Sequence, residues 1–306
     1  MSLNDAFREI FRCLICGEKL SWMGHSLTCE NDHHFPVIRG IPRFVSSDGY
    51  AGSFSFEWNV HNNTQLDTHR DDGWSEETFR QKTGLTPDDV RGKLVLDAGA
   101  GAGRYAEILS RWGANVVGAD LSLAVEAAAG NVRGRENALI VQGDIGNLPF
   151  GHGTFDHIVS IGVLHHTPDT RRYTQSLIKL LKPGGRIAIW LYHREGELGR
   201  RPPWIPVVSS IPSPKYYDWC RWFVPLTYKY ETTSFMRFIR CVFPYSVQHK
   251  GIENDILDTF DGYSPVFHGV HTNNEVKVWF HEMDLEDVTA LDWPVSVVGY
   301  RPRERN

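Results

Sequence analysis

Residues 95–105, VLDAGAGAGRY, place a glycine-rich loop directly after a short apolar run. Glycines at Gly99, Gly101 and Gly103 let the backbone approach a ligand closely. A dinucleotide-binding loop has the spacing G-x-G-x-x-G, whereas this loop has G-x-G-x-G, and the G-x-x-x-x-G-K-[ST] pattern of a P-loop does not occur in it. The stretch therefore predicts a ligand-binding loop that is not built for a pyrophosphate.

Acidic residues follow three successive apolar runs. Asp97 lies two residues before Gly99, where a carboxylate repels phosphate and suits a cation such as the α-ammonium group of an amino acid. Asp120 ends the second run, where a carboxylate can accept both ribose hydroxyls. Asp144 follows the third and can accept a hydrogen bond from an adenine amino group. An ammonium, a ribose and a base together indicate S-adenosylmethionine.

The segment around the loop alternates short apolar runs with amphipathic ones. We expect strands over 93–96, 115–119, 138–142, 157–161 and 186–190, and helices over 104–112, 123–132 and 170–181. This alternation predicts a parallel sheet with helices on both faces, whose ligand lies at the carboxyl ends of the strands.

These motifs resemble the class I S-adenosylmethionine-dependent methyltransferases, in particular the ubiquinone-methyltransferase-like group (methyltransferase type 11). The resemblance spans about 92–192 and rests on residues 95–103, 120–122, 143–144, 148–150, 155–160, 163–166 and 181–185. It implies a Rossmann-like α/β fold with a seven-stranded, mostly parallel sheet of order 3-2-1-4-5-7-6, in which strand seven is antiparallel. The last two strands are expected over 288–291 and 295–300, after a helix over 274–283.

The resemblance and the strand-end positions together give a set of expected cofactor-binding residues. They are Asp97, Ala98, Gly99, Gly101, Gly103, Asp120, Leu121, Gly143, Asp144, Ile145 and Ser160. A generic nucleotide-binding α/β domain, or a non-catalytic relative, remains an alternative interpretation.

Methyl transfer needs the acceptor atom held in line with the methyl group, and a hydroxyl acceptor also needs a base. His165 and His166 follow the fourth strand, where the methyl group is expected, and a histidine of near-neutral pKa suits that role. Tyr192 and His193 follow the fifth strand at the same edge. We treat all four as candidate catalytic residues; a helix cap or pocket wall is the alternative for the histidines, and a solvated loop for the other two.

Three cysteines and a histidine cluster near the N-terminus. Cys13, Cys16, Cys29 and His33 form the pattern C-x2-C-x12-C-x3-H, a donor set that suits tetrahedral structural Zn²⁺. The surrounding residues resemble the zinc-ribbon module found ahead of some methyltransferases, and that resemblance selects His33, with His34 or His25 as alternatives. A metal-free hairpin with incidental cysteines is the competing interpretation.

Composition shifts divide the chain into five segments. They are a zinc-ribbon-like module (1–45), a linker or lid (46–91), the cofactor-binding core (92–192), an acceptor-side insert (193–270) and a final helix and strands (271–306). We expect the insert to be irregular and its aromatic residues, including those at 202–206, 216–219 and 222–225, to line an acceptor pocket or a dimer contact. It also carries scattered positive charge at Arg200, Arg201, Lys215, Arg237 and Arg240, and isolated thiols at Cys220 and Cys241.

The chain has 306 residues, 41% of them hydrophobic, and a formal net charge of −5, which disfavours a general nucleic-acid binder. No apolar run is long enough to span a bilayer, and we expect a cytoplasmic protein, with a homodimer as one possible state.

The leading hypothesis is a methyltransferase acting on a small-molecule or saccharide-like acceptor, with S-adenosylmethionine as cofactor and a structural zinc. The alternatives are an RNA methyltransferase that binds rRNA or tRNA through the zinc module, and a cofactor-binding scaffold without activity. A dehydrogenase is a more distant interpretation.

Overall fold

The computed structural model describes residues 4–47, 49–60, 66, 68, 73–195, 205–230, 233 and 251–303. Arg200, Arg201, Arg237, Arg240 and Cys241 lie outside these ranges, as do the aromatic and proline positions 202–204.

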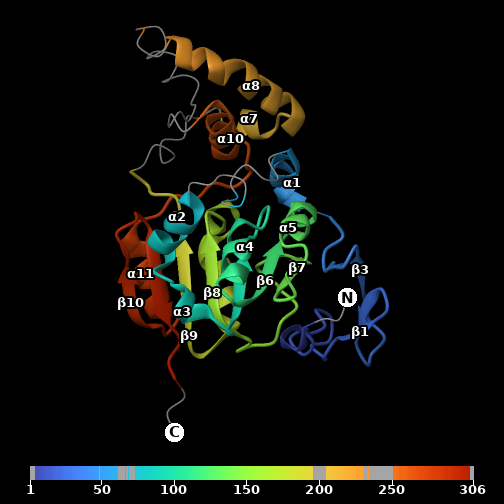
Figure 1. The fold of residues 1–306 in the computed structure, drawn as a ribbon. Helices are drawn as coiled ribbons and strands as arrows, with labels where there is room; N and C mark the ends of the chain where they lie inside the picture. The colour runs from blue at the N-terminus through green and yellow to red at the C-terminus, as the bar shows by residue number, and fades with distance from the viewer. Residues whose placement is uncertain are drawn as a thin grey trace.

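A seven-stranded sheet forms the centre of the molecule, in the order β10-β11-β9-β8-β5-β6-β7 (Figure 1). Its strands are β5 (Leu94–Ala98), β6 (Asn115–Asp120), β7 (Ala138–Gln142), β8 (Phe155–Ile161), β9 (Leu181–Trp190), β10 (Glu286–Ala290) and β11 (Ser296–Tyr300). Pairing is parallel from β9 to β7, and β11 is antiparallel to both of its neighbours. In order of appearance along the chain this is 3-2-1-4-5-7-6, so the predicted fold and strand order are confirmed.

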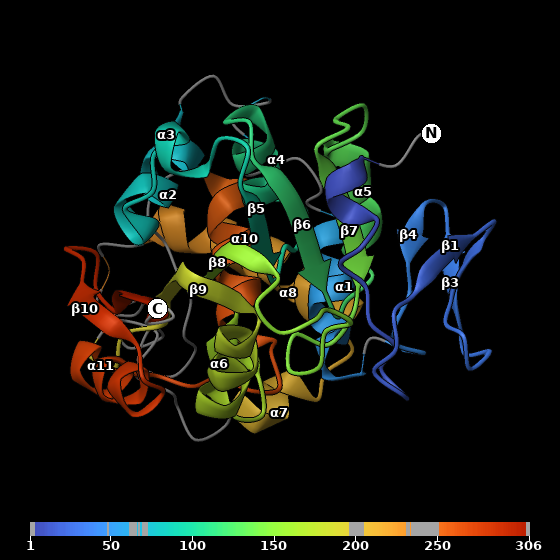
Figure 2. The same ribbon diagram turned by 90° about the horizontal axis from the view of Figure 1, so that it is seen from below.

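Helices cover both faces of the sheet (Figure 2). One face carries α2 (Trp74–Thr83), α3 (Pro87–Val90), α4 (Arg104–Arg111) and α5 (Val125–Asn131); the other carries α6 (Thr170–Lys179) and α11 (Asn273–Glu282). The expected helix over 123–132 begins later, because residues after Asp120 form a turn in which the Ser122 amide and hydroxyl both donate to the Asp120 carboxylate. The fifth strand begins earlier than expected, at Leu181, which pairs with Phe155.

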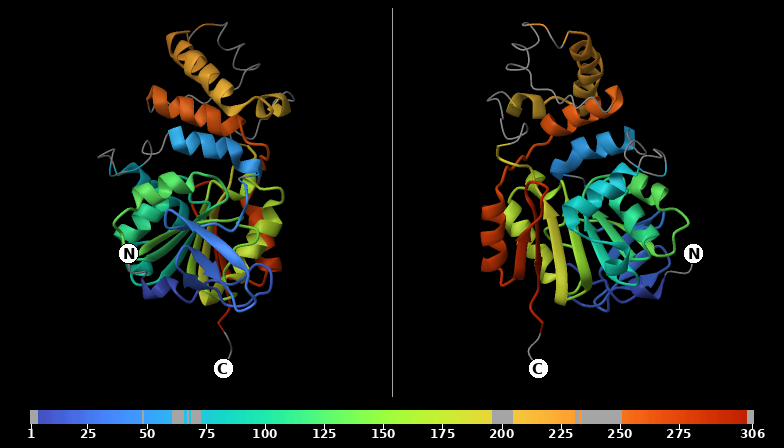
Figure 3. Two further views of the ribbon diagram at one scale, coloured as in Figure 1. Left: turned by 90° about the vertical axis from the view of Figure 1, so that its right-hand side faces the viewer. Right: turned by 60° about the vertical axis from the view of Figure 1, so that its left-hand side comes forward.

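Three layers of helix lie above the carboxyl ends of the parallel strands (Figure 3). They are α1 (Gly52–Val60, preceded by the 3-10 turn η2, Gly49–Ala51), α10 (Ile252–Tyr263) and α8 (Ser213–Tyr230, preceded by α7, Ile205–Ser209). We call α1, α8 and α10 the roof. Phe56 of α1 contacts Tyr217 of α8 and Phe260 of α10, with ring centroids 5.5 and 5.9 Å apart.

The expectation of an irregular insert is wrong for α8 and α10, and two of the aromatic residues expected to line a pocket or a dimer contact are instead buried. Tyr216, Tyr217 and Val224 are buried in a core that α8 shares with α10. The prolines and aromatic residues suggested irregular structure, but α8 accommodates Pro225 within its 18 residues. The rings of Tyr216 and Tyr217 pack between the two helices and are therefore not free to line a pocket, whereas Trp222 is 65% exposed.

The N-terminal module packs directly against the sheet. It contains η1 (Asp5–Phe7) and four short antiparallel strands: β1 (Ser21–Met23), β2 (Ser26–Thr28), β3 (His34–Ile38) and β4 (Ile41–Pro42). After β4 the chain runs alongside the edge strand β7, where the Phe44 amide donates to the Gln142 carbonyl over 2.9 Å. Phe11 contacts Phe44 and Phe150, and the module shares one buried cluster with the sheet. The module therefore covers an edge strand that would otherwise expose unpaired backbone groups.

Within the described ranges, no helix combines the length and the apolar character needed to cross a membrane.

Candidate functional site

Backbone amides of the glycine loop donate to the neighbouring strand β6. The amides of Gly99 and Ala100 both bond the Ala119 carbonyl, at 2.7 and 3.0 Å, and the Gly101 amide bonds the Asp120 carboxylate at 2.8 Å. Groups engaged in this way do not form an anion cradle. The geometry agrees with the prediction that this loop is not a pyrophosphate site.

Gly99 has a φ of +89°, and a Cβ atom there would lie 2.3 Å from the side-chain carbons of Val163. Val163 immediately precedes the 3-10 turn η4 (Leu164–His166), which carries the histidine pair. The glycine loop and the histidine pair are thus held against each other with no room for a side chain at Gly99.

The Asp97 carboxylate is 1% exposed, and neither oxygen has a hydrogen-bond partner in the described part of the chain. Burial, and secondarily the charge of Asp120, raise the pKa of Asp97 to about 7. A buried carboxylate with nothing to neutralise it is costly, so this position suits a bound cation.

Asp120 holds the glycine loop and the following turn at once. One oxygen accepts the Gly101 amide, and the other accepts the amide and the hydroxyl of Ser122, at 2.8 and 2.6 Å. Burial raises the pKa of this carboxyl group. A carboxylate offers about four acceptor positions, so Asp120 retains capacity for a further donor such as a ribose hydroxyl.

Asp144 lies in the loop after β7, with Gly143 before it and the buried Ile145 after it. The Gly143 amide donates to the Asp120 carbonyl, which ties this loop to the end of β6. The Asp144 carboxylate accepts the Tyr173 hydroxyl at 3.3 Å and the Gly146 amide at 2.9 Å. The three predicted acids therefore occupy the carboxyl ends of three adjacent strands.

Ser160 and Ala98 lie inside the sheet at the same edge. The fully buried Ser160 hydroxyl donates to the Ala98 carbonyl over 2.8 Å. This bond links β8 to β5 directly beside Asp97.

The two histidines differ in environment. His165 is 0% exposed, stacks 3.8 Å from Tyr192 between ring centroids, and has no hydrogen-bond partner on either nitrogen among the described residues. Burial lowers its pKa well below the usual value. The Nδ1 atom of His166 lies 2.9 Å from the Phe267 carbonyl oxygen. Because a carbonyl only accepts, Nδ1 carries the proton and Nε2 is the basic nitrogen of the neutral ring.

Tyr192 connects the histidine pair to acids in the roof. Its hydroxyl donates to Asp261 of α10 over 3.0 Å, and burial raises the pKa of Asp261 to about 7. Glu57 of α1 is 0% exposed with both oxygens unbonded among the described residues, and burial and Asp261 raise its pKa well above the usual value. His193, the fourth candidate, pairs through its backbone with His271 outside this group.

The sequence analysis missed Glu57 and Asp261 as site residues. Nothing in the sequence around Glu57 or around Asp261 predicts that two helices distant in the chain bring these acids together near Tyr192. Helix α1 also reaches the loop after Asp120, because Ser55 accepts the Leu123 amide. Phe54 of the same helix lies 5.2 Å from His166 between ring centroids.

Cys13, Cys16, Cys29 and His33 come together in the N-terminal module, with all four ligand atoms within 4.8 Å of one another. The Cys16 and Cys29 sulfurs are 3.7 Å apart, and His33 Nδ1 lies 3.5 and 3.4 Å from the sulfurs of Cys13 and Cys29. A tetrahedral zinc with bonds of about 2.3 Å to sulfur and about 2.0 Å to nitrogen implies edges of about 3.8 and about 3.5 Å. The donor set and its spacing therefore fit that metal.

The alternative ligand His34 points elsewhere. Its ring bonds the Thr28 hydroxyl at 3.0 Å and the Asp32 carboxylate at 2.9 Å. His25, the other alternative, is exposed and is not part of the four-residue group.

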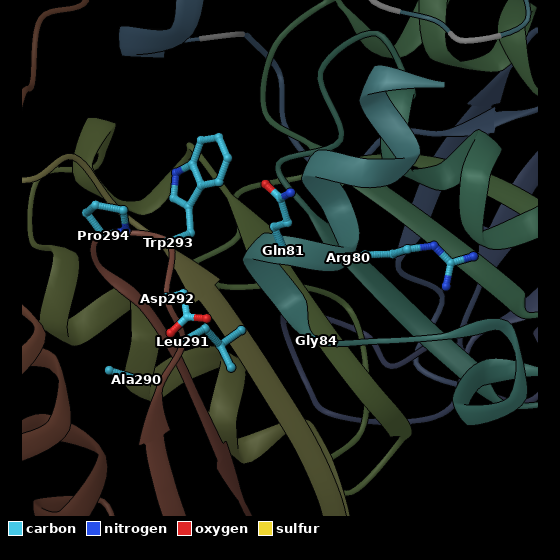
Figure 4. A pocket seen from close by; sticks show the side chains of 8 residues that line it. All are labelled: Arg80, Gln81, Gly84, Ala290, Leu291, Asp292, Trp293 and Pro294. Atoms are coloured by element: carbon cyan, nitrogen blue, oxygen red, sulfur yellow. The ribbon is translucent and has the colours of Figure 1, made fainter. Parts of the chain in front are cut away.

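A separate hollow lies between the end of α2 and the β10–β11 hairpin (Figure 4). It is lined by Arg80, Gln81, Gly84, Ala290, Leu291, Asp292, Trp293 and Pro294. None of the predicted site residues belongs to it, so it is distinct from the strand-end site.

Residues 96–189 match a family described as "Methyltransferase domain". The demethylmenaquinone methyltransferase of Thermobifida fusca (strain YX) is 35% identical over 117 residues, 37% of this chain and 50% of the relative. That of Clavibacter sepedonicus is 29% identical over 215 residues, 66% of this chain and 84% of the relative. The Mus musculus "Probable tRNA methyltransferase 9B" is 36% identical over 111 residues, 35% of this chain and 24% of the relative. The chain thus spans about half the length of the first of these curated relatives.

The uncompensated Asp97 carboxylate predicts a pH-dependent stability. Its pKa is about 7 in the folded protein and about 3.9 in an unfolded chain. The folded state then holds a proton that the unfolded state has lost, so the free energy of unfolding falls as pH rises from about 4 to about 7. Asp97→Asn cannot ionise, so its free energy of unfolding lacks this loss. Between pH 4 and pH 8 we expect its free energy of unfolding to rise relative to that of the wild type by up to about 4 kcal/mol.

Urea unfolding without cofactor at several pH values measures this difference. The control is Asp88→Asn, whose side chain is 94% exposed and should follow the wild type. Parallel pH profiles for Asp97→Asn and the wild type would contradict the assignment.

Proposed function

We propose that the chain is a class I S-adenosylmethionine-dependent methyltransferase and that it methylates a small-molecule or saccharide-like acceptor. The observation that carries the proposal is the row of buried polar groups along the carboxyl edge of the sheet. It runs from Asp97 through His165 and Tyr192 to Asp261 and Glu57.

The cofactor supplies a sulfonium-bound methyl group that is already a strong electrophile. We assign Asp97 to its ammonium group, because that carboxylate is buried and unbonded among the described residues. Asp120 would accept the ribose hydroxyls and Asp144 the adenine amino group, with Gly99, Gly101 and Gly103 as the loop beneath. The neighbouring backbone at Ala98, Leu121, Gly143 and Ile145 and the hydroxyl of Ser160 shape the same edge.

On the acceptor side, His166 is the proposed base. Its Nδ1–H is fixed on the Phe267 carbonyl, so Nε2 is the nitrogen that takes a proton from an acceptor hydroxyl as the oxygen attacks the methyl carbon. A bound cofactor would supply the methyl group, with a neutral thioether as the leaving group. His165 stacks on Tyr192 and positions this turn, and His193 pairs through its backbone with His271.

The roof supports a hydroxyl-rich acceptor. The Glu57 carboxyl group is fully buried with no bond from the described residues, and Asp261 and Tyr192 present further polar atoms nearby. Buried polar groups are stable when a ligand completes their hydrogen bonds, and vicinal sugar hydroxyls have that chemistry. The relatives named for quinone methylation agree with a small-molecule acceptor.

The cysteine–histidine group is proposed to hold a structural zinc. Four protein ligands complete a tetrahedron and leave no position for a reactant, so the metal stabilises the module. The Ile15 amide points at the Cys13 sulfur over 3.4 Å, as in a zinc knuckle.

An RNA-binding role for this module is disfavoured by its charges. Its basic residues are Arg8, Arg12, Lys19, Arg39 and Arg43, and each contacts an acidic side chain or a backbone carbonyl. A basic surface free to meet phosphates is therefore not apparent among residues 4–45.

Transfer of a labelled methyl group from S-adenosylmethionine into fractionated cell extract tests the function. We expect label in the small-molecule or saccharide fraction. Label confined to RNA would favour the alternative of an RNA methyltransferase. Cofactor binding without transfer to any fraction would indicate a scaffold without activity.

Asp120→Ala should weaken S-adenosylhomocysteine binding at least about 100-fold, because it removes a charge-assisted hydrogen-bond acceptor from a buried site. Titration calorimetry measures the affinity and thermal unfolding checks the fold. The control Ser122→Ala removes a hydrogen bond to the same carboxylate, and its affinity for S-adenosylhomocysteine should fall only a few-fold. An unchanged affinity in Asp120→Ala would remove the cofactor assignment.

His166→Gln should lower kcat about 10²–10⁴-fold on the fraction that accepts label, because the base is lost. Binding of S-adenosylhomocysteine should stay within two-fold of the wild type. His152→Gln, an exposed histidine, serves as the control. Full turnover by His166→Gln would exclude His166 as the base.

Elemental analysis of the purified protein should find one zinc per chain, and Cys16→Ser should lose it. Because such modules fold around their metal, we also expect faster proteolysis of the N-terminal segment in this variant. Cys220→Ser, a thiol outside the cluster, should keep the metal. A metal-free preparation whose module stays folded would refute the site.

A further inference from the structure

Arg43 links the N-terminal module to the edge of the sheet. It follows β4, and its side chain is only 7% exposed. The guanidinium donates through Nη1 to the Gln142 side-chain oxygen over 2.8 Å and through Nη2 to Glu126 of α5. The backbone amide of the next residue, Phe44, donates to the Gln142 carbonyl, so Gln142 accepts hydrogen bonds from two consecutive residues of the module.

Gln142 carries the connection to the cofactor loops. Its side-chain amide donates to the Leu121 carbonyl over 3.0 Å, one residue after Asp120. The guanidinium has only donors, so it fixes which end of the Gln142 amide faces Leu121. On the backbone, the Gly143 amide bonds the Asp120 carbonyl. Hydrogen bonds therefore connect the module to the backbone of Asp120 and Leu121, and the Asp120 carboxylate in turn accepts the Gly101 amide.

We propose that Arg43 is a positioning residue for the cofactor. In this proposal the folding of the N-terminal module and its metal determine how tightly the cofactor binds. The inference rests on the proposed roles of Asp120 and Leu121. It gives the module a role at the cofactor site, in place of the recruitment of RNA.

The strands of the module extend the connection back to the cluster. Cys29 and His33 flank the turn between β2 and β3, and the Cys29 amide bonds the His33 carbonyl. β3 then pairs with β4, and the Arg43 amide donates to the Pro36 carbonyl of β3 over 2.9 Å. Loss of order at the cluster thus loosens the strand on which Arg43 depends.

A purely structural explanation fits Arg43 less well. Burying a guanidinium is costly, and a hydrophobic side chain of similar size often packs as well or better. What the guanidinium adds is orientation of one amide, and that amide contacts a cofactor loop.

The test compares Arg43→Met with Arg39→Met by titration calorimetry of S-adenosylhomocysteine. Arg39 also contacts Glu126, at 3.6 Å, but its side chain is 78% exposed and no bond to Gln142 is described for it. We expect Arg43→Met to weaken binding about 10-fold and Arg39→Met less than 2-fold, a difference in the usual range for coupled sites. Thermal unfolding confirms that both variants are folded.

Two further variants separate positioning from general destabilisation. Gln142→Met should weaken binding like Arg43→Met, and the double variant should be no weaker, because both changes break one connection. Cys16→Ser should weaken binding in the wild-type background and add little to Arg43→Met.

Equal affinities in Arg43→Met and Arg39→Met, or additive losses in the double variant, would overturn the inference. If Arg43→Met does not fold, Gln142→Met decides by the same affinity criterion. Failure of the wild type to bind S-adenosylhomocysteine would instead overturn the proposed function.

Discussion

The buried, uncompensated carboxylate of Asp97 is the constraint on which the site depends. It ends the central strand, where the sheet and the glycine loop exclude water, and Asp120 on the next strand adds negative charge. The loop cannot relieve it, because several of its amides already bond β6. A ligand that brings a positive charge removes this cost, whereas one that brings phosphate increases it. The proposed assignment of the cofactor's ammonium group to Asp97 rests on this unfavourable burial.

The order of the sheet and the place of the three candidate acids at its carboxyl edge could be predicted because short-range signals determine them. Asp97, Asp120 and Asp144 each end a short apolar run, and parallel pairing brings such ends to one edge. The cluster of Cys13, Cys16, Cys29 and His33 was likewise readable from spacing. Glu57 and Asp261 were not, since they meet only because α1 packs on α10, a contact between residues about 200 positions apart.

The roof shows why composition misled the sequence analysis. An insert rich in aromatic residues suggested an irregular pocket wall, yet Tyr216 and Tyr217 bury their rings between α8 and α10. The same side chains serve either purpose, and burial between two helices stabilises them more than exposure at a pocket rim. The polar groups that remain facing the site, Glu57 and Asp261, come from the helices these rings hold in place.

Segments outside the matched family domain therefore act on opposite ends of one site. The N-terminal module reaches the loop that follows Asp120 through Arg43 and Gln142, and the roof reaches the histidine pair through Asp261 and Tyr192. Relatives that share the domain carry names with different acceptors, so the domain itself does not decide the acceptor. Among the described residues, the roof adds Asp261, which accepts the Tyr192 hydroxyl, and the buried Glu57 beside it, so the proposed choice of acceptor rests on the roof.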